Sequence, residues 1–236
     1  MIDLFFMTSP NVYKICIALE ELGLDYRSIP VDLPGGQHLD PARMGGAING
    51  KVPVIIDHGG AGETPVTIFE SGAILQYLAE KHGALLPADF AGRMDVMQWL
   101  FWQAGGLGPF GGQCFHFRAL APVLAGDVDN EYARRRYARI FGELWSVMET
   151  RLTGRAFLAG DYSIADIACY PWIDYLAPDE GRERFPRVAD WHRRLAARPA
   201  IQKAYVKARL VDMGHARNEI DTVVYTVDEL RAVVTL

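Results

Sequence analysis

Apolar residues follow two different spacings along the chain, and the change falls near residue 90. Strand-like apolar runs occupy 2–6, 26–31, 52–57 and 66–69, and helical spacing occupies 12–22 and 71–83. The order is strand, helix, strand, then strand, strand, helix, with turn chemistry over 58–65 joining the last two strands. A parallel strand–helix–strand unit that continues into a hairpin and a covering helix is typical of a thioredoxin-like α/β domain.

Between residues 91 and 210 only helical spacing is found. It covers 92–104, 131–152, 164–177 and 187–199. The glycine-rich stretch GGLGPFGG, residues 105–112, is expected to break the first of these helices. We therefore expect three parts: an α/β domain over 1–86, an all-α domain over 91–210, and a C-terminal extension over 211–236 that packs on another part of the protein.

Composition narrows the classes of protein. Half of the 236 residues are hydrophobic and 11% are aromatic, so a sizeable core can form. No apolar run is long enough to span a membrane, and the first residues lack the features of a signal peptide. The net charge of −5 argues against nucleic acid as the main partner. Three scattered cysteines and six scattered histidines match no metal-ligand spacing, so we expect no metal and a cytoplasmic location.

The first candidate site is the stretch TSPN, which joins the first strand to the first helix. Pro10 suits the first helical turn, and Ser9 is then a natural N-cap. Ser9 can be only a cap, but a helix start also offers N–H donors and positive potential that stabilise a thiolate. In thiol-redox proteins of this order a cysteine usually stands where Ser9 stands, so here the thiol would come with the substrate.

Two further stretches carry candidate chemistry. In GKVPVI, Pro53 either marks a strand boundary or forms a cis bond that turns the backbone of Val52 outward, toward an extended peptide. In FESGAI, Ser71 can cap the next helix, whose start favours an anion, and Glu70 could pair with an ammonium group or remain a solvated acid. Together the three stretches fit a small zwitterionic peptide that carries a thiol, which describes glutathione.

The same stretches, in this order, resemble the glutathione transferase superfamily over roughly residues 1–210. The segments TSPNVYKICIALEELGLDY, MQWLFWQAGGLGPFGGQ and DYSIADIACYPW resemble its nu class, which is related to bacterial disulfide-bond reductases and to a fungal prion-forming nitrogen regulator. The resemblance implies a thioredoxin-like N-terminal domain followed by an all-α C-terminal domain. It also implies glutathione, reduced or as its disulfide, as co-substrate, a homodimer, and no metal.

The resemblance also implies roles for particular residues. Asn11 would be the main polar group near the glutathione sulfur, with Ser9 beside it as the second catalytic residue. Gln37 would contact the glycyl or γ-glutamyl part, and Val52, followed by a cis Pro53, would offer its backbone. Glu70 and Ser71 would hold the γ-glutamyl amino and carboxylate groups.

Three other positions are interpreted with the same pattern. Arg136 would reach a second glutathione, although Arg134 and Arg135 beside it are expected to face solvent. Val12 replaces the glycine that is usual in this class and would narrow the mouth of the pocket. Cys114 is unusual in its position and is expected to be a buried thiol rather than a reactive one.

The resemblance leaves more than one activity open. Thiol–disulfide exchange between glutathione and a small disulfide is favoured, because phenylalanines stand at the end of the first strand, where many conjugating transferases have tyrosine. Conjugation to, or a lyase reaction on, an electrophilic substrate is the alternative. Two hypotheses of another class also remain: a glutathione-binding regulatory protein with little turnover, and a purely structural helical partner. In SIAD, Ser163 and Asp166 form a capping box that serves folding and not a site.

Overall fold

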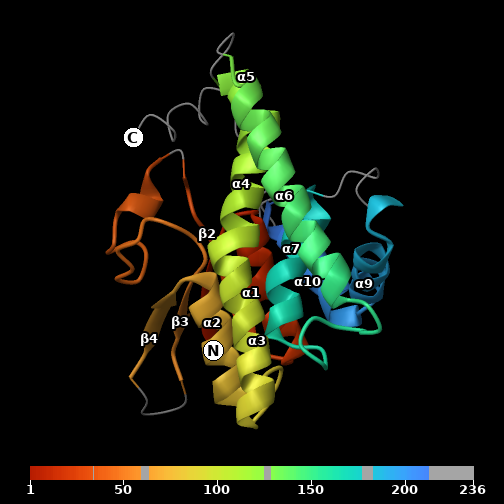
Figure 1. Cartoon of the computed structure of the whole chain (residues 1–236). Helices are drawn as coiled ribbons and strands as arrows, with labels where there is room; N and C mark the ends of the chain where they lie inside the picture. The colour runs from red at the N-terminus through yellow and green to blue at the C-terminus, as the bar shows by residue number, and fades with distance from the viewer. Residues whose placement is uncertain (34, 60–63, 125–128, 177–182, 213–236) are drawn as a thin grey trace. The chain divides into compact units, whose positions relative to one another are not determined.

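A computed structural model describes residues 1–33, 35–59, 64–124, 129–176 and 183–212 (Figure 1). By their mutual contacts they form two units, one made of Met1–His82 with the helix that follows Arg198, and one made of Gly83–Ala197. The predicted domain limits 1–86, 91–210 and 211–236 stay a prediction. Residues 60–63 of the expected hairpin turn and 213–236 of the expected extension lie outside the described residues.

The first unit holds a mixed four-stranded sheet in the order β2-β1-β3-β4. Its strands are β1 (Ile2–Phe6), β2 (Tyr26–Pro30), β3 (Val54–Asp57) and β4 (Val66–Phe69). The strand β1 is parallel to β2 and antiparallel to β3, and β4 is antiparallel to β3. With helices α1 (Pro10–Glu21) and α2 (Ser71–His82), this is the predicted thioredoxin-like arrangement, and a short 3₁₀ turn, Gln37–Leu39, follows β2.

Both faces of the central strands are buried, which explains why β1 is apolar apart from Asp3, whose buried carboxylate is paired with Arg27. Phe5 and Val54 are paired across β1 and β3 and pack in one cluster with Met44 and Ala47, from the loop after β2. Side chains alternate along a strand, so the neighbouring pair points to the opposite face, where α2 contacts β3 and β4. A strand that is buried on both faces has no polar face to alternate with its apolar one.

A further helix, α10 (Pro199–Asp212), packs along α1 within the first unit. Most of its range was expected to belong to the all-α domain 91–210, and its packing on α1 was not predicted from the sequence. The Glu20 carboxylate of α1 lies 2.7 Å from the Lys203 ammonium and 2.5 Å from the Lys207 ammonium of α10. Tyr13 also stacks on Tyr205, with ring centroids 4.3 Å apart. These contacts join residues about 190 positions apart, so they leave no local signature in the sequence.

The second unit is helical, as expected. It contains α3 (Phe90–Trp102), α4 (Gly108–Phe115), α5 (Ala121–Leu124), α6 (Glu131–Arg151), α7 (Ile164–Leu176) and α9 (Pro186–Ala196). The capping box is confirmed, because the Ser163 N–H donates to the Asp166 carboxylate at 3.2 Å and the Ala165 N–H to Ser163 Oγ at 3.3 Å. No helix in the described ranges has both the length and the apolar character needed to cross a membrane.

The expected break at GGLGPFGG is wrong, because the helix continues through it. The elements α3, α4 and α5 form one column (Figure 1), joined by two π-helical turns, Gln103–Leu107 and His116–Leu120. A Cβ on Gly108 would lie 2.8 Å from Gln103 Nε2 and 3.3 Å from the Gln103 carbonyl oxygen, which is too close, whereas a Cβ on Gly112 would make ordinary contact with the Trp172 ring of α7 at 3.7 Å. Gly108 therefore fits against the π-helical turn that begins at Gln103, and the widened turn before Pro109 adapts the helix to a residue without an N–H.

Candidate functional site

The register of the sheet brings most of the predicted site residues to one edge. Phe5 of β1 is paired with Val54 of β3, and Val54 is paired with Phe69 of β4. The ends of β1 and β4 and the start of β3 therefore lie side by side. The candidate segments, 8–11 after β1, 52–53 before β3 and 70–71 after β4, are the chain segments that leave this edge.

The segment after β1 begins α1 as predicted. Ser9 is the N-cap, its backbone is extended, and its Oγ accepts a hydrogen bond from the Val12 N–H at 3.3 Å. The Ser9 carbonyl accepts from the Tyr13 N–H at 3.0 Å. A hydroxyl that accepts one hydrogen bond still has its own proton to donate. Ser9 and Asn11, both partly buried, can thus present polar hydrogens beside the positive end of α1.

The segment before β3 has the geometry expected of a peptide-binding backbone. The Val52–Pro53 peptide bond is cis, as predicted, and β3 begins only at Val54. Among the described residues, no backbone hydrogen bond is found for the Val52 N–H or C=O. Both groups can therefore pair with an extended ligand. Gln37 follows β2, and its Oε1 accepts from the Asp32 N–H at 2.9 Å, which leaves the two amide donors of Gln37 for another partner.

The segment after β4 combines an unusual backbone with a helix start. Glu70 has a φ of 71°, in the left-handed region that a non-glycine residue rarely adopts. Its carbonyl accepts from the Ile74 N–H at 2.9 Å, so α2 starts directly after it. Such a backbone is kept only where the surroundings require it, and it is often found at ligand-binding positions. Ser71 and the first N–H groups of α2 are donors of the kind that can bind an anion.

Beneath this helix start lies a residue that the sequence analysis missed. Lys14 of α1 is only 1% exposed, and its ammonium donates to Ser71 Oγ at 3.2 Å. A lysine flanked by buried Val12, Ile15 and Cys16 was the available signal. Its partner is 57 residues away, however, and sequence spacing does not show such a contact.

The predicted arginine run lies on α6 of the second unit. Arg134 and Arg135 are exposed and both contact Glu131, as expected of a solvated face. Arg136 is exposed as well. The thiol of Cys114, in the same unit, is partly buried, and burial raises its pKa while Arg118 opposes that effect. An unusually reactive thiolate is not favoured there.

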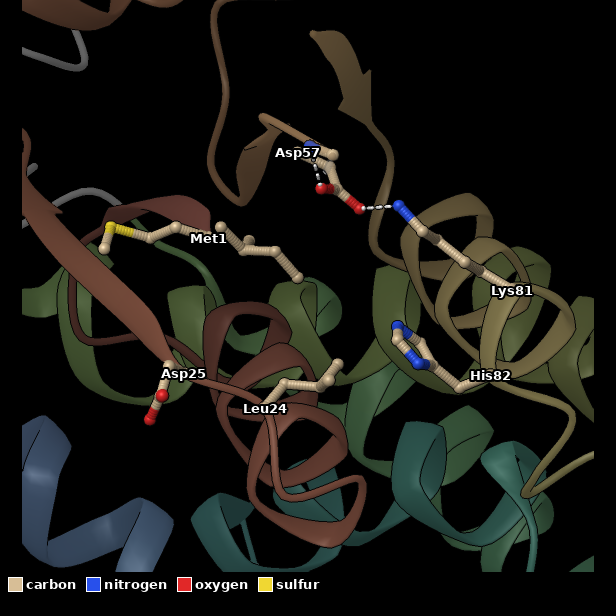
Figure 2. Close-up of a pocket in the computed structure, with 8 residues that line it drawn as sticks. Met1, Leu24, Asp25, Asp57, Lys81 and His82 are labelled. Atoms are coloured by element: carbon tan, nitrogen blue, oxygen red, sulfur yellow. Dashed lines mark hydrogen bonds and ion pairs between the residues drawn. The ribbon is translucent and has the colours of Figure 1, made fainter. Parts of the chain in front are cut away.

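The opposite edge of the sheet holds a surface pocket of about 400 Å³ (Figure 2). Two of its charged groups are paired with each other: the Lys81 ammonium lies 2.7 Å from Asp57 Oδ2, which also accepts from the Tyr77 hydroxyl at 2.9 Å. Burial alone would raise the pKa of Asp57, but hydrogen bonds from Lys81, the Gly59 N–H and Tyr77 outweigh it and lower that pKa. The pocket is therefore lined by a structural ion pair.

Replacement of Lys81 by methionine is expected to test this pairing. In the natural protein Asp57 stabilises the fold at pH values above its unfolded pKa of about 4, and this contribution is lost as the pH falls through its lowered folded pKa. Without Lys81, the unpaired buried carboxylate of Asp57 should lower the free energy of unfolding by about 2 kcal/mol at pH 7. The pKa of Asp57 should then rise, so that its carboxyl group is protonated more readily. The difference between the two proteins in urea unfolding should then shrink between pH 7 and pH 4.5. An equal difference at both pH values would contradict the argument.

In the described ranges, no group of three or more His, Cys, Asp or Glu side chains is arranged to hold a metal ion. The chemistry that remains is that of hydroxyls, amides, one acid and one buried cation around two helix starts. Such an arrangement can bind a ligand that has both an acidic and a basic group, and it can stabilise a thiolate that the ligand brings.

Comparison with known proteins agrees with this chemistry. Sequence models of the glutathione S-transferase N-terminal and C-terminal domains match residues 8–81 and 131–194. Disulfide-bond oxidoreductase YfcG of Escherichia coli is 45% identical over 219 residues, which cover 90% of this chain and 98% of that protein.

Two solved structures extend the comparison to three dimensions. A glutathione transferase of Pseudomonas putida, with one glutathione disulfide per subunit, has a TM-score of 0.78 and 37% identity over 86% of this chain and 90% of its own. A family member of Pseudomonas fluorescens with two glutathiones bound has a TM-score of 0.79 and 37% identity, over 86% of this chain and 91% of its own. By sequence and by fold, the chain belongs to the glutathione S-transferase family.

Proposed function

We propose that the protein is a glutathione-dependent disulfide oxidoreductase that reduces small disulfides with the thiol of bound glutathione. The observation that carries the proposal is a helix start suited to a thiolate, at Ser9 and Asn11, with no cysteine in the turn. The names of two relatives, the disulfide-bond oxidoreductases YfcG and YghU, support this reaction class.

The protein's own cysteines are poor candidates for the nucleophile. Cys16 is on α1 but is fully buried, and burial, reinforced by Glu20, raises its pKa to about 12. Cys169 is also buried, and Cys114 has a raised pKa. Since the thiolate is the reactive form, the attacking sulfur has to be that of the ligand. Three free cysteines also favour a reducing, cytoplasmic location.

The reaction then proceeds in two exchanges. The glutathione thiolate attacks one sulfur of the substrate disulfide, forms a mixed disulfide, and releases the other sulfur as a thiolate that takes up a proton. A second glutathione thiolate attacks the mixed disulfide, which yields glutathione disulfide and the second substrate thiol. Two glutathiones thus supply the two electrons. We assign the second one to Arg136; the two glutathiones bound to the Pseudomonas fluorescens protein support the use of a second glutathione.

The first glutathione occupies the edge where β1 and β4 end. Its cysteinyl backbone pairs with Val52, beside the cis Pro53, and its sulfur lies near Asn11 and Ser9. Its γ-glutamyl carboxylate is bound by Ser71 and the start of α2, and its amino group by Glu70. Gln37 contacts the glycyl end. The support is the unpaired Val52 peptide among the described residues and the left-handed backbone of Glu70.

Steady-state turnover tests the proposal. Reduction of 2-hydroxyethyl disulfide by glutathione is measured beside conjugation of 1-chloro-2,4-dinitrobenzene. We expect ready reduction and weak conjugation, since buried phenylalanines, Phe5 and Phe6, stand where a thiolate-binding tyrosine would be needed. Conjugation without reduction would make the protein a conjugating transferase or lyase. No turnover, with glutathione still bound, would favour a regulatory binding protein.

We also propose a homodimer of the nu class. Each unit exposes large apolar side chains, Val66 and Phe69 on β4 of the first unit and Phe90, Met94 and Phe101 on α3 of the second. Exposed apolar groups of this size are typical of surfaces that another subunit covers. The measurement is light scattering at micromolar concentration. A molecular mass equal to that of a monomer would contradict the proposal.

A further inference from the structure

The least expected feature of the first unit is the buried cation on α1. Lys14 is 1% exposed and is among the largest fully buried side chains of the described residues. Burial of an ammonium group is costly unless hydrogen bonds and negative charge compensate for it. Its ammonium lies 3.2 Å from Ser71 Oγ, at the point where α2 begins. The cation therefore stands at the helix start to which the proposed function assigns the γ-glutamyl carboxylate.

The contact determines which way the Ser71 hydroxyl points its proton. A lysine ammonium has three donors and no acceptor, so in this hydrogen bond Ser71 Oγ is the acceptor. The Ser71 proton is then directed to another partner. With the charge behind it and the first N–H groups of α2 around it, the hydroxyl is a donor prepared for an anion.

The neighbouring acid completes the pattern. Glu70 precedes Ser71, is exposed, and is held in a left-handed backbone at the end of β4. A buried positive charge behind the hydroxyl and an exposed negative charge next to it match a carboxylate and an ammonium attached to the same carbon atom. That pair is the head group of a free α-amino acid.

We propose that Lys14 is a positioning residue that acts through Ser71 and makes this subsite selective for ligands with a free α-carboxylate. The inference rests on the proposed function and deepens it, because it names the group by which thiol substrates are chosen. A thiol peptide that keeps its cysteine but lacks the α-carboxylate of the γ-glutamyl residue is then a poor substrate. Lys14 affects binding of the thiol substrate and not the exchange step.

The test compares two thiols and two enzymes. The thiols are glutathione and 4-aminobutyryl-cysteinyl-glycine, which differs from glutathione only in lacking the α-carboxylate. The enzymes are the natural protein and Lys14→Met, which has a similar volume and no charge. For glutathione we expect Lys14→Met to raise KM roughly ten- to fifty-fold and leave kcat within about twofold. For the analogue both constants should barely change.

A second variant separates the charge from the hydrogen bond. Lys14→Gln keeps an N–H donor without the charge, and its KM for glutathione should fall between those of the natural protein and Lys14→Met. Lys81→Met is the matched control, since it also removes one lysine paired in the same unit but contacts Asp57. It should lower stability and leave the KM ratio of the two thiols unchanged.

The outcomes distinguish this inference from the function on which it rests. No glutathione turnover or binding by the natural protein would overturn the proposed function. Turnover with equal KM values for the two thiols in the natural protein would overturn the role of Lys14, whether or not the variants fold. An equal rise in KM for both thiols in Lys14→Met would show a merely structural lysine and would overturn it as well.

Discussion

Replacement of Asp166 by alanine is expected to lower the free energy of unfolding by about 3 kcal/mol at pH 7.5. Asp166 is 0% exposed, and its Oδ1 accepts from the Leu158 N–H at 3.0 Å and from Trp191 Nε1 at 2.8 Å. Its Oδ2 accepts from the Ser163 N–H at 3.2 Å. Alanine would leave these buried donors without an acceptor, and relief of the buried charge would offset only part of the cost.

The large effect is expected because one carboxylate joins three parts of the second unit. It stands in the first turn of α7, binds the loop before that helix through Leu158 and Ser163, and binds α9 through Trp191. Asp166→Asn keeps one acceptor oxygen and should cost less than Asp166→Ala. The control is Asp190→Ala, in which an exposed acid paired with Arg193 is removed, and there the change should stay within about 0.5 kcal/mol.

The pH dependence of the free energy of unfolding gives a second test of the role of Asp166. Burial raises the pKa of Asp166 from 3.8 to about 6, although hydrogen bonds from Trp191, Leu158 and Ser163 oppose the rise. Between these values the folded protein holds a proton that the unfolded chain has released. The extra stability that this bound proton supplies is therefore full below pH 4 and is lost as the pH rises through 6, whereas the hydrogen bonds that the carboxylate accepts remain at pH 7.5. The natural protein should lose stability relative to Asp166→Asn across this window, and a parallel pH profile would contradict the assignment.

Urea unfolding of the three variants, followed by tryptophan fluorescence, is the measurement. A loss below about 1 kcal/mol for Asp166→Ala would mean that water or a shift of the loop satisfies the donors instead. The Asp190 control guards against an effect of net charge alone.

This network also shows what local sequence could and could not predict. The capping box spans three residues, so the Ser-Ile-Ala-Asp stretch predicted it, and the N-cap at Ser9 was predicted by the Ser-Pro pair in the same way. The hydrogen bond from Trp191 to Asp166 spans 25 residues and had no such signal. Local chemistry determines the ends of helices, whereas tertiary packing determines what else their residues bind.

The glycine-rich segment shows a second limit of prediction from local sequence. Glycine and proline have poor helix propensity, and from propensity alone 105–112 was expected to be a break. The helix persists because Gly108 has no Cβ to clash with Gln103 in the π-helical turn, and because packing of the segment on Trp172 of α7 outweighs the local cost. A sequence that disfavours a helix by its local propensity is thus stabilised as a helix by contact with a residue more than 60 positions away.

The candidate site lies between these two cases. The order of strands and helices along the chain followed from hydrophobic spacing. The observed strand register then places Ser9, Val52 and Ser71 at one edge of the sheet. Their roles toward glutathione stay predictions. Lys14 could not be inferred in this way, because a lysine within a helical segment is ordinarily solvated, and only the packing of α1 on α2 buries it.

Replacement of Asn11 by alanine is expected to lower the rate of disulfide reduction by about 10- to 100-fold with saturating glutathione. Asn11 lies in the first turn of α1, after the N-cap Ser9, and is partly buried. Its amide N–H group is the side-chain donor that we assign to the ligand's sulfur. Loss of a preorganised donor costs less at a large, soft thiolate than at an oxyanion, so the expected loss lies below the roughly 10²- to 10³-fold seen at oxyanion sites.

The mechanism of the loss can be separated from its size. If Asn11 lowers the pKa of the bound thiol, Asn11→Ala should shift the acidic limb of the pH–rate profile to higher pH, and the rate difference should shrink in alkaline solution. The thiolate absorbance of bound glutathione near 240 nm follows the same titration. Asn11→Asp places a negative charge at this position and should shift the limb further. Thermal unfolding of both variants should match that of the natural protein, since the cap at Ser9 is intact.

The profile also decides between two roles for Asn11. A constant deficit at every pH would mean that the amide orients the sulfur for attack and leaves its pKa to Ser9 and the start of α1. An unchanged rate with an unchanged profile would remove Asn11 from the site, and the thiolate would then depend on the backbone of the first turn alone. A lower rate of either kind, constant or pH-dependent, would keep the reacting sulfur at the end of β1, where the chain has a hydroxyl and an amide in place of a cysteine.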